Sequence, residues 1–274
     1  MKRILQLYIL LPLFIHSMEV SQPTLHELVT NIQMLQSYLE RGLNVDITDC
    51  DQKTLLYLAV EKNCYQSVEL LLAYKASIYK QDTKSITPLM AACKDPKHFT
   101  CLKLLLNLNH DNADSQTQYS ERTYAARTAI DYNNIIALKE LAGYGINVND
   151  FLLSTACGLN NIHAGSILIF YGANIDQQDF FKQTPLIYSC QQKANFETTQ
   201  FLLSQNTNKF LCDLNGKKAI DYATSQEEKE LLSSPKKPLI PQLARNTMLY
   251  CYTQGKNVVS RLALREIGKN FIKK

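Results

Sequence analysis

The heptapeptide TPLIYSC, residues 184–190, has a close copy in TPLMAAC, residues 87–93. Both begin with a Thr-Pro step, continue with apolar residues and end with a cysteine. Related segments are TLLYLAV at residues 54–60 and FLLSTAC at residues 151–157. Four copies of one short pattern indicate a repeat architecture, and a repeat has to be recognised before any single residue within it is interpreted.

Three weaker copies extend the series, which then has a regular spacing. They are TLHELV, YAARTA and KAIDYA, and successive copies begin 27 to 37 residues apart. A Leu-rich cluster follows the start of the best copies after roughly 16 to 19 residues, and a turn follows after roughly 21. The seven first residues, called anchors below, are Thr24, Thr54, Thr87, Tyr124, Phe151, Thr184 and Lys218.

The residues at the two ends of the repeat predict helices. Thr at the anchor can cap a helix, and the Pro that follows it at residues 88 and 185 fits the first helical turn. Gly145 and Gly172, after the second apolar cluster, suit the left-handed residue that ends a helix. Each repeat is therefore predicted to be a turn, a short helix, a longer helix and a hairpin-like loop.

This pattern resembles the ankyrin repeat, whose Thr-Pro-Leu-His-x-Ala motif recurs every 33 residues. The resemblance covers residues 24–234, although Tyr57, Met90, Ser154 or Ile187 stands where the family has His. It implies an all-α ankyrin-repeat solenoid of about seven helix-turn-helix repeats with a helical C-terminal extension.

Two irregularities interrupt the spacing of the repeats. An insertion at residues 109–123 lengthens the third repeat, and the loop before Phe151 is almost deleted. We expect the stack of repeats to change its twist there.

Cys93, Cys157 and Cys190 each lie six residues after an anchor. Other repeats have compact or apolar residues at this position, and cysteine behaves as a small apolar residue where helices approach closely. We therefore interpret these three cysteines as part of the core. Two alternatives stay open for Cys50, Cys64 and Cys212, namely a disulfide in an oxidising compartment or reduced thiols.

No group of residues in the sequence forms a recognisable catalytic or metal-binding motif. Cys-x-x-Cys, His-Glu-x-x-His and Gly-x-Ser-x-Gly are all absent. His110, Asp111 and Asp114 cluster in the insertion, where they could attract a cation or form a solvated loop. We expect a protein that is not an enzyme and has no cofactor, no metal and no small-molecule substrate.

Repeat solenoids usually bind another protein on their concave surface. In the ankyrin-like interpretation this surface is built from the loop before each anchor and from the end of the first helix. Phe180 and Phe181 are adjacent aromatic residues in one such loop, and aromatic residues dominate binding hot spots. The predicted partner-binding residues are Lys53, Lys62, Lys84, Ile86, Lys94, Phe180, Phe181 and Gln183.

The N-terminus resembles an export signal. Lys2 and Arg3 precede an apolar run from residue 4 to residue 15, and the small Ser17 follows. The alternative is an amphiphilic first helix of the fold. No later apolar run is long enough to cross a membrane, so we expect a soluble mature chain exported to the periplasm or the medium. Exported ankyrin-like proteins are typical of microbes inside host cells, which implies a secreted effector delivered to a host.

The C-terminal residues differ in charge from the rest of the chain. Residues 235–274 carry a net charge of +8, whereas residues 18–234 carry −6. This contrast favours docking within the chain or onto an acidic partner. Nucleic acid is not the expected partner, because the tail contains no recognisable binding module. The predicted parts are a signal peptide at 1–17, an ankyrin repeat domain at 18–234 and a basic helical extension at 235–274.

The tail also resembles a degenerate SOCS box. This resemblance rests on residues 238–248 and 259–272, although Ala244, Ala263 and Arg265 replace the family's Cys and two prolines. It implies a second hypothesis, a substrate-recognition adaptor for a cullin-type ubiquitin ligase. The alternative is a helix pair that caps the last repeat, because the ends of solenoids need a polar cap.

Overall fold

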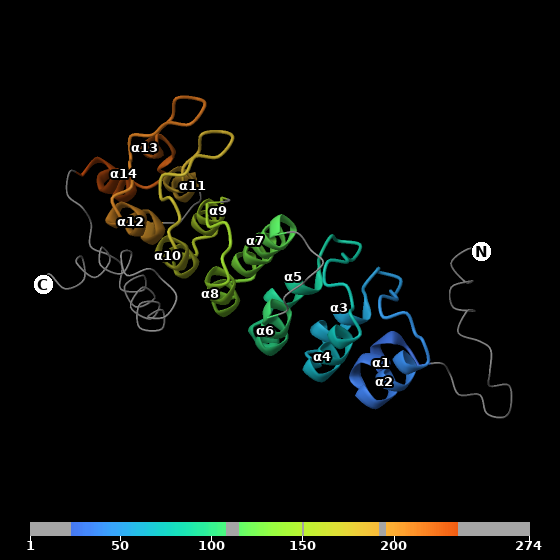
Figure 1. Ribbon diagram of the computed structural model, residues 1–274. Coiled ribbons are helices and arrows are strands. Elements are labelled where there is room, and N and C mark those ends of the chain that lie inside the picture. The colour runs from blue at the N-terminus through green and yellow to red at the C-terminus, as the bar shows by residue number, and fades with distance from the viewer. Residues whose placement is uncertain (1–22, 108–114, 150, 192–195, 235–274) are drawn as a thin grey trace, which may run out of the picture. The chain divides into compact units, whose positions relative to one another are not determined.

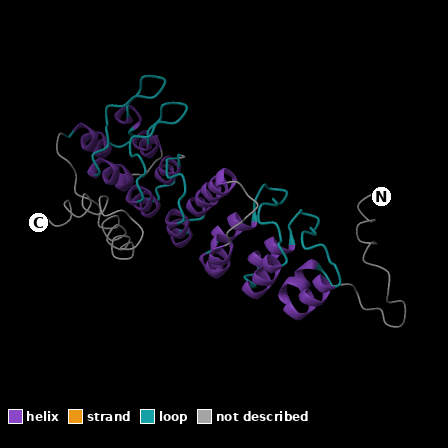
Figure 2. Ribbon diagram, viewed as in Figure 1, coloured by secondary structure: helices purple, strands orange, loops and turns teal. Residues whose placement is uncertain are grey.

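The computed structural model describes residues 23–107, 115–149, 151–191 and 196–234, which form helices joined by turns and loops (Figure 1, Figure 2). Three predictions lie outside these residues: the signal peptide at 1–17, the His110, Asp111 and Asp114 cluster, and the extension at 235–274. The described residues fall into two compact units. Unit 1 comprises residues up to 92 together with 100–108, and unit 2 comprises 93–99 and the residues from 109 onward.

Unit 1 is a stack of short helix pairs, each with a first helix and a second helix. Its helices are α1 (Leu25–Thr30), α2 (Ile32–Glu40), α3 (Leu55–Glu61), α4 (Tyr65–Ala73), α5 (Pro88–Cys93, apart from its last residue) and α6 (Phe99–Asn107, apart from its first residue). The first helices α1 and α3 pack against each other, and so do the second helices α2 and α4.

Unit 2 continues the same plan with four helix pairs. After the 3₁₀ turn η2 (Pro96–His98) come α7 (Ser115–Asp131), α8 (Ile135–Gly143), α9 (Leu152–Gly158), α10 (Ile162–Phe170), α11 (Pro185–Gln191), α12 (Phe196–Ser204), α13 (Ala219–Tyr222) and α14 (Gln226–Ser233). The first helices α7, α9, α11 and α13 pack in that order. The described residues thus contain seven helix pairs, the number predicted from the anchors.

Six of the seven anchors directly precede a first helix, as the sequence predicts. The seventh, Tyr124, lies inside α7, because the second part of the predicted insertion at 109–123 is helical from Ser115 and extends this first helix backward. The hydroxyls of Thr54, Thr87 and Thr184 accept hydrogen bonds from the backbone N–H three residues later, at 3.1, 3.2 and 3.2 Å. Gly145 and Gly172 end second helices with φ of +79° and +95°, values that favour glycine. These local signals fix where each helix starts and stops.

The core consists of apolar side chains between the first and second helices. Cys93, Cys157 and Cys190 are at most 1% exposed, so their interpretation as core residues is confirmed. Burial raises the pKa of the Cys190 thiol to about 12, and it also raises the pKa values of Cys93 and Cys157. All three thiols are therefore protonated and inert near neutral pH.

The loop before α9 is short, as the spacing of the anchors predicts. Phe151 occupies the cap position of α9 in the left-handed region, with φ of +57° and no side-chain cap hydrogen bond. It stands where Thr begins the first helix in other repeats. Only eight residues separate α8 from α9, against fourteen between α10 and α11.

Candidate functional site

The loops before four anchors share one hairpin geometry, and we call each of them a finger. The fingers are residues 49–54 and 82–87 in unit 1, and residues 179–184 and 213–218 in unit 2. Each begins with an Asp that lies five residues before the anchor. In Figure 1 the two fingers of unit 2 are the loops that extend beyond α11 and α13.

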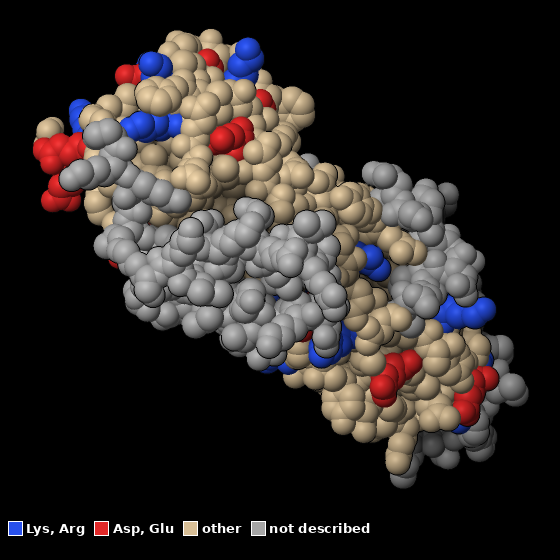
Figure 3. Space-filling view, turned by 60° about the vertical axis from the view of Figure 1, so that its left-hand side comes forward, with Lys and Arg blue, Asp and Glu red and all other residues tan. Residues whose placement is uncertain are grey.

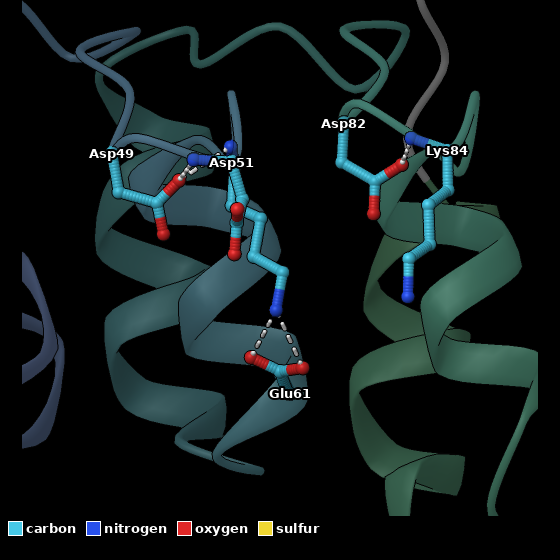
Figure 4. A network of polar contacts seen from close by, with 6 residues as sticks. Asp49, Asp51, Glu61, Asp82 and Lys84 are labelled. Carbon is cyan, nitrogen blue, oxygen red and sulfur yellow. Dashed lines mark hydrogen bonds and ion pairs between the residues drawn. The ribbon is translucent and has the colours of Figure 1, made fainter.

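A single carboxylate oxygen holds each finger closed. Oδ1 of Asp179 accepts the backbone N–H groups of Phe181 and Gln183, at 2.9 and 2.7 Å. Oδ1 of Asp49 does the same for residues 51 and 53, at 2.9 and 2.9 Å. Oδ1 of Asp82 accepts the N–H of Lys84 at 2.8 Å (Figure 4) and that of Ile86 at 2.9 Å. Oδ1 of Asp213 accepts the equivalent groups at 2.8 and 2.9 Å. The aspartate therefore satisfies two backbone donors that a free loop would leave to water.

In unit 2 a tyrosine fixes the second oxygen of each carboxylate. The Tyr188 hydroxyl donates to Oδ2 of Asp179 at 2.8 Å, and the Tyr222 hydroxyl donates to Oδ2 of Asp213. Partial burial and this hydrogen bond raise the pKa of Tyr188 to about 12. Because the tyrosines belong to α11 and α13, each finger is tied to the first helix that follows it.

Neighbouring fingers within a unit are also joined to each other. The backbone N–H of Thr83 donates to the Asp51 carbonyl at 2.9 Å, and that of Leu214 donates to the Phe181 carbonyl at 3.0 Å. In unit 2 the Gln178 amide adds bonds to the carbonyls of Lys182 and Cys212, at 2.8 and 3.1 Å. The finger tips of unit 2 are thus held in place before any ligand arrives.

The tips of the unit 2 fingers are apolar and solvent-exposed. Phe180 is 87% exposed, Phe181 65% and Leu214 59%. The Phe180 ring contacts the Phe151 ring, at a centroid distance of 5.7 Å. In unit 1 the equivalent tip residues are Cys50 and Asp51 in one finger and Thr83 and Lys84 in the other. The finger geometry therefore does not require aromatic tips.

Among the predicted site residues of unit 1, Lys53 forms side-chain interactions, whereas other lysines are exposed to solvent. Lys53 forms an ion pair with Glu61 at 3.0 Å (Figure 4), and its ammonium lies 5.2 Å from the centre of the Tyr57 ring. Partial burial alone would lower the pKa of Lys53, but the hydrogen bond and charge of Glu61 raise it. Lys62 and Lys84 are exposed, whereas Ile86 is half-buried at the base of its finger.

In unit 2 the predicted residues Phe180, Phe181 and Gln183 share one finger, whereas Lys94 lies elsewhere. The Lys94 ammonium is 5.8 Å from the centre of the Tyr132 ring, beside the end of α7. Tyr132 and Leu159 follow the ends of first helices and are 56% and 54% exposed. Sequence reasoning did not single out Tyr132, although it occupies the position after α7 that Leu159 occupies after α9.

The finger aspartates were also missed from the sequence. Each is the fifth residue before an anchor, so counting backward from the anchors would have found them. The face in Figure 3 shows the charged side chains standing singly or in small groups among uncharged ones. Among the described residues no cluster of His, Cys, Asp and Glu could hold a metal ion. No two cysteines in that part of the chain are joined by a disulfide.

Comparison with known proteins identifies the repeat type. A family model for ankyrin repeats, in three copies, matches residues 153–234. Dog inversin is 32% identical over 123 residues, which are 44% of this chain and 11% of inversin, and human inversin is 30% identical over the same length. The match therefore spans only 11% of the length of these relatives.

Solved structures with the same fold support this assignment. The ankyrin repeat domain of human ASB11 aligns with a TM-score of 0.64 and 20% identity over 78% of this chain and all of that one. The ankyrin repeat domain of Bcl-3 aligns with a TM-score of 0.66 and 21% identity, over 79% of this chain and all of that one. The predicted fold class, an all-α ankyrin-repeat solenoid, is confirmed. The likeness of the tail to a SOCS box rests on the sequence alone, because the family model ends at residue 234. No helix in the described ranges is long and apolar enough to span a bilayer.

Proposed function

The chain carries ankyrin repeats, and from this premise we propose that it is a non-enzymatic scaffold that binds a protein partner. The partner contacts the fingers and the exposed ends of the first helices. In unit 2 the contacts are Phe180, Phe181, Gln183 and Lys94, and in unit 1 they are Lys53, Lys62, Lys84 and Ile86. Ankyrin-type modules typically act in this way, through rigid surfaces that need no chemical step.

The exposure of Phe180 and Phe181 carries the proposal. Two adjacent aromatic side chains at 87% and 65% exposure are costly in water, and the finger geometry does not require them, because the other fingers of this chain lack them. Burying one such ring against a partner contributes about 1.5 to 3 kcal/mol. The hydrogen bonds that hold the finger reduce the entropy that is lost on binding. Rigid apolar tips are thus suited to act as hot spots.

The test is a pull-down with a variant in which the tip residues are replaced by those of another finger. Phe180→Thr/Phe181→Lys gives the finger at 179–184 the tip residues of the finger at 82–87. We expect the partners recovered by quantitative mass spectrometry to fall at least about tenfold, the loss that 1.4 kcal/mol produces. Phe196→Ala, which changes an exposed ring of α12 outside the fingers, should leave them unchanged. Equal recovery of the same partners by the finger variant would remove the proposed hot spot.

We also propose that the protein is exported, on the basis of the charge and apolar run in residues 1–17. The measurement is N-terminal sequencing of the chain recovered from the culture medium, periplasm or host cell. A mature N-terminus close to residue 18 is expected. A chain that stays in the producing cell with its first residues intact would contradict export, whatever the outcome for partner binding.

A further inference from the structure

The two fingers of unit 2 present lysines to solvent and turn their carboxylates inward. The side chains of Lys182, Lys217 and Lys218 are exposed. Asp179 is half-buried and Asp213 is buried, and backbone N–H groups and a tyrosine hydroxyl donate to the oxygens of each. The outer surface of these fingers therefore carries three ammonium groups and no exposed carboxylate, although residues 18–234 together carry −6.

Comparison with unit 1 shows that these lysines lack an acidic partner within the fold. Lys217 is the fourth residue after its base aspartate, the position that Lys53 occupies in the finger at 49–54. Lys53 forms an ion pair with Glu61 at 3.0 Å, but the corresponding residue of the last repeat is Ser225, which carries no charge. The Lys217 ammonium instead lies 5.4 Å from the centre of the Tyr222 ring. In the described ranges no ion pair involves any of the three lysines of the unit 2 fingers.

The apolar tips lie on the same surface as these cations. Phe180, Phe181 and Leu214 belong to the same two fingers and are all exposed. The fingers lie side by side (Figure 1), since the Leu214 N–H donates to the Phe181 carbonyl at 3.0 Å. One surface thus combines apolar area with positive charge, and its backbone is fixed by the hydrogen bonds of both fingers.

We propose that the partner segment bound at this surface is a short stretch of protein in which acidic residues stand beside leucine or aromatic residues. This inference rests on the proposed function and names the chemistry of the partner. The apolar side chains of the segment cover Phe180, Phe181 and Leu214, while its carboxylates approach the three lysines. Opposite charge of this kind speeds association and selects among partners more than it adds to affinity.

The charge of the surrounding chain favours a short segment over a membrane or a nucleic acid. Residues 18–234 are acidic as a whole, so the positive charge of these fingers is local. An extended polyanion would approach the acidic remainder as well and be repelled by it. A short acidic segment contacts the fingers alone.

The test is the selection of short peptides from a random displayed library on the full chain. We expect Asp and Glu beside apolar residues to be enriched at least about threefold over the starting library, in line with several exposed ion pairs. The lysine variant, Lys182→Gln/Lys217→Gln/Lys218→Gln, should abolish this enrichment. Glutamine is accommodated at the first two of these positions, because Gln52 and Gln183 occupy them in other fingers.

A matched control removes the same amount of charge elsewhere. Lys75→Gln/Lys103→Gln/Lys229→Gln changes three exposed lysines outside the fingers and should keep the enrichment. The affinity of one selected peptide, measured by fluorescence anisotropy, should fall at least about threefold in the lysine variant and stay unchanged in the control. Both variants keep the basic residues 235–274, so a difference between them belongs to the fingers.

The outcomes separate this inference from the proposed function. Selected peptides that require Phe180 and Phe181 but show no excess of acidic residues would overturn the inference and leave the proposed function standing. If Phe180→Thr/Phe181→Lys loses none of the selected peptides, or no peptide is selected at all, both fail.

A second probe tests a membrane as the occupant. Vesicles of phosphatidylcholine and phosphatidylserine in equal parts are sedimented with the wild type and with the lysine variant. We expect equal, low binding of the two chains. Co-sedimentation that the lysine variant abolishes, without acidic enrichment among the peptides, would assign the surface to an anionic membrane and overturn the inference.

Discussion

At the scale of single residues, the base and the tip of a finger have different roles. The aspartate at the base makes the hydrogen bonds that shape the hairpin, and the tip residues make almost none with their side chains. Asp179 illustrates the base and Phe180 the tip. This division predicts which substitutions change stability and which do not.

Replacing the base aspartate should destabilise unit 2. Asp179→Ala leaves two backbone N–H groups and the Tyr188 hydroxyl without their acceptor, and we expect a loss of about 1–3 kcal/mol in the free energy of unfolding. Urea titration followed by circular dichroism measures this loss. Asp51→Ala, which removes an exposed tip carboxylate in unit 1, is the matched control and should change the free energy by less than about 0.5 kcal/mol. Equal effects of the two substitutions would show that the base hydrogen bonds do not support the fold.

The Asp179–Tyr188 pair should also respond to alkaline pH. The pKa of Tyr188 is about 12 in the folded chain, against 10.0 for an ordinary tyrosine. Between these values the unfolded chain loses this proton first, so the contribution of Tyr188 to stability is complete below pH 10 and declines as the pH rises toward 12. Ultraviolet titration of tyrosinate should therefore show a late-titrating fraction that becomes smaller in Tyr188→Phe. Tyr222, whose pKa is also raised by its hydrogen bond to Asp213, keeps part of this fraction in the variant. A tyrosinate curve that is unchanged by this substitution would contradict the assignment.

At the scale of elements, the sequence predicts the helices well because their signals are local. Thr54, Thr87 and Thr184 cap first helices, and Gly145 and Gly172 end second helices, so both ends of a helix can be read within a few residues. The hairpin-like loop was predicted, but the hydrogen bonds that shape each finger were not, because one aspartate makes them with backbone groups and, in unit 2, with a tyrosine of the next helix. Backbone donors leave no pattern in a sequence.

The finger tip should be exchangeable without cost to the fold. Phe180→Thr/Phe181→Lys reproduces the tip of the finger at 82–87, whose base hydrogen bonds have nearly the same lengths. We expect a change of less than about 0.5 kcal/mol in the free energy of unfolding, measured by urea titration. A loss of several kcal/mol would mean that the two rings support the fold, and their exposure would then no longer argue for a partner.

Two glycines at helix ends of unit 2, Gly172 and Gly158, should differ in their tolerance of alanine. Gly172 has a φ of +95° with open space around it, so Gly172→Ala adds only backbone strain and should cost about 1–2 kcal/mol. Gly158 lies in α9 with ordinary φ, and a Cβ there would meet Tyr188 at 3.9 Å, a normal contact. Gly158→Ala should be neutral or slightly stabilising, because alanine favours a helix. Thermal unfolding measures the stability of the two variants. A larger loss of stability in Gly158→Ala than in Gly172→Ala would contradict this account of the turns.

At the scale of the whole molecule, the described chain divides into two compact units. The units meet in sequence near the predicted insertion at 109–123. The spacing of the anchors reveals the insertion but not the division into two units. The packing of a repeat depends on which of its side chains face the neighbouring repeats, and the spacing does not show this. A division of this kind predicts that damage to the core stays local.

Matched core substitutions test this locality. Leu56 in unit 1 and Leu168 in unit 2 are both fully buried, so truncation to alanine should cost about 2–5 kcal/mol at each site. Hydrogen exchange read by mass spectrometry should show that Leu56→Ala reduces protection in α1 to α4 and that Leu168→Ala reduces it in α9 to α12. Uniform loss of protection in both variants would show that the chain unfolds as one cooperative body.

The carboxylate at the base of each finger has a consequence for how this protein could change over time. The base aspartates Asp49, Asp82, Asp179 and Asp213 hold four fingers whose tip residues differ from one another. A single amino-acid substitution at a tip therefore changes what the surface recognises and leaves the fold intact. Recognition can therefore drift from one target to another in small steps, each of them made by a protein that still folds.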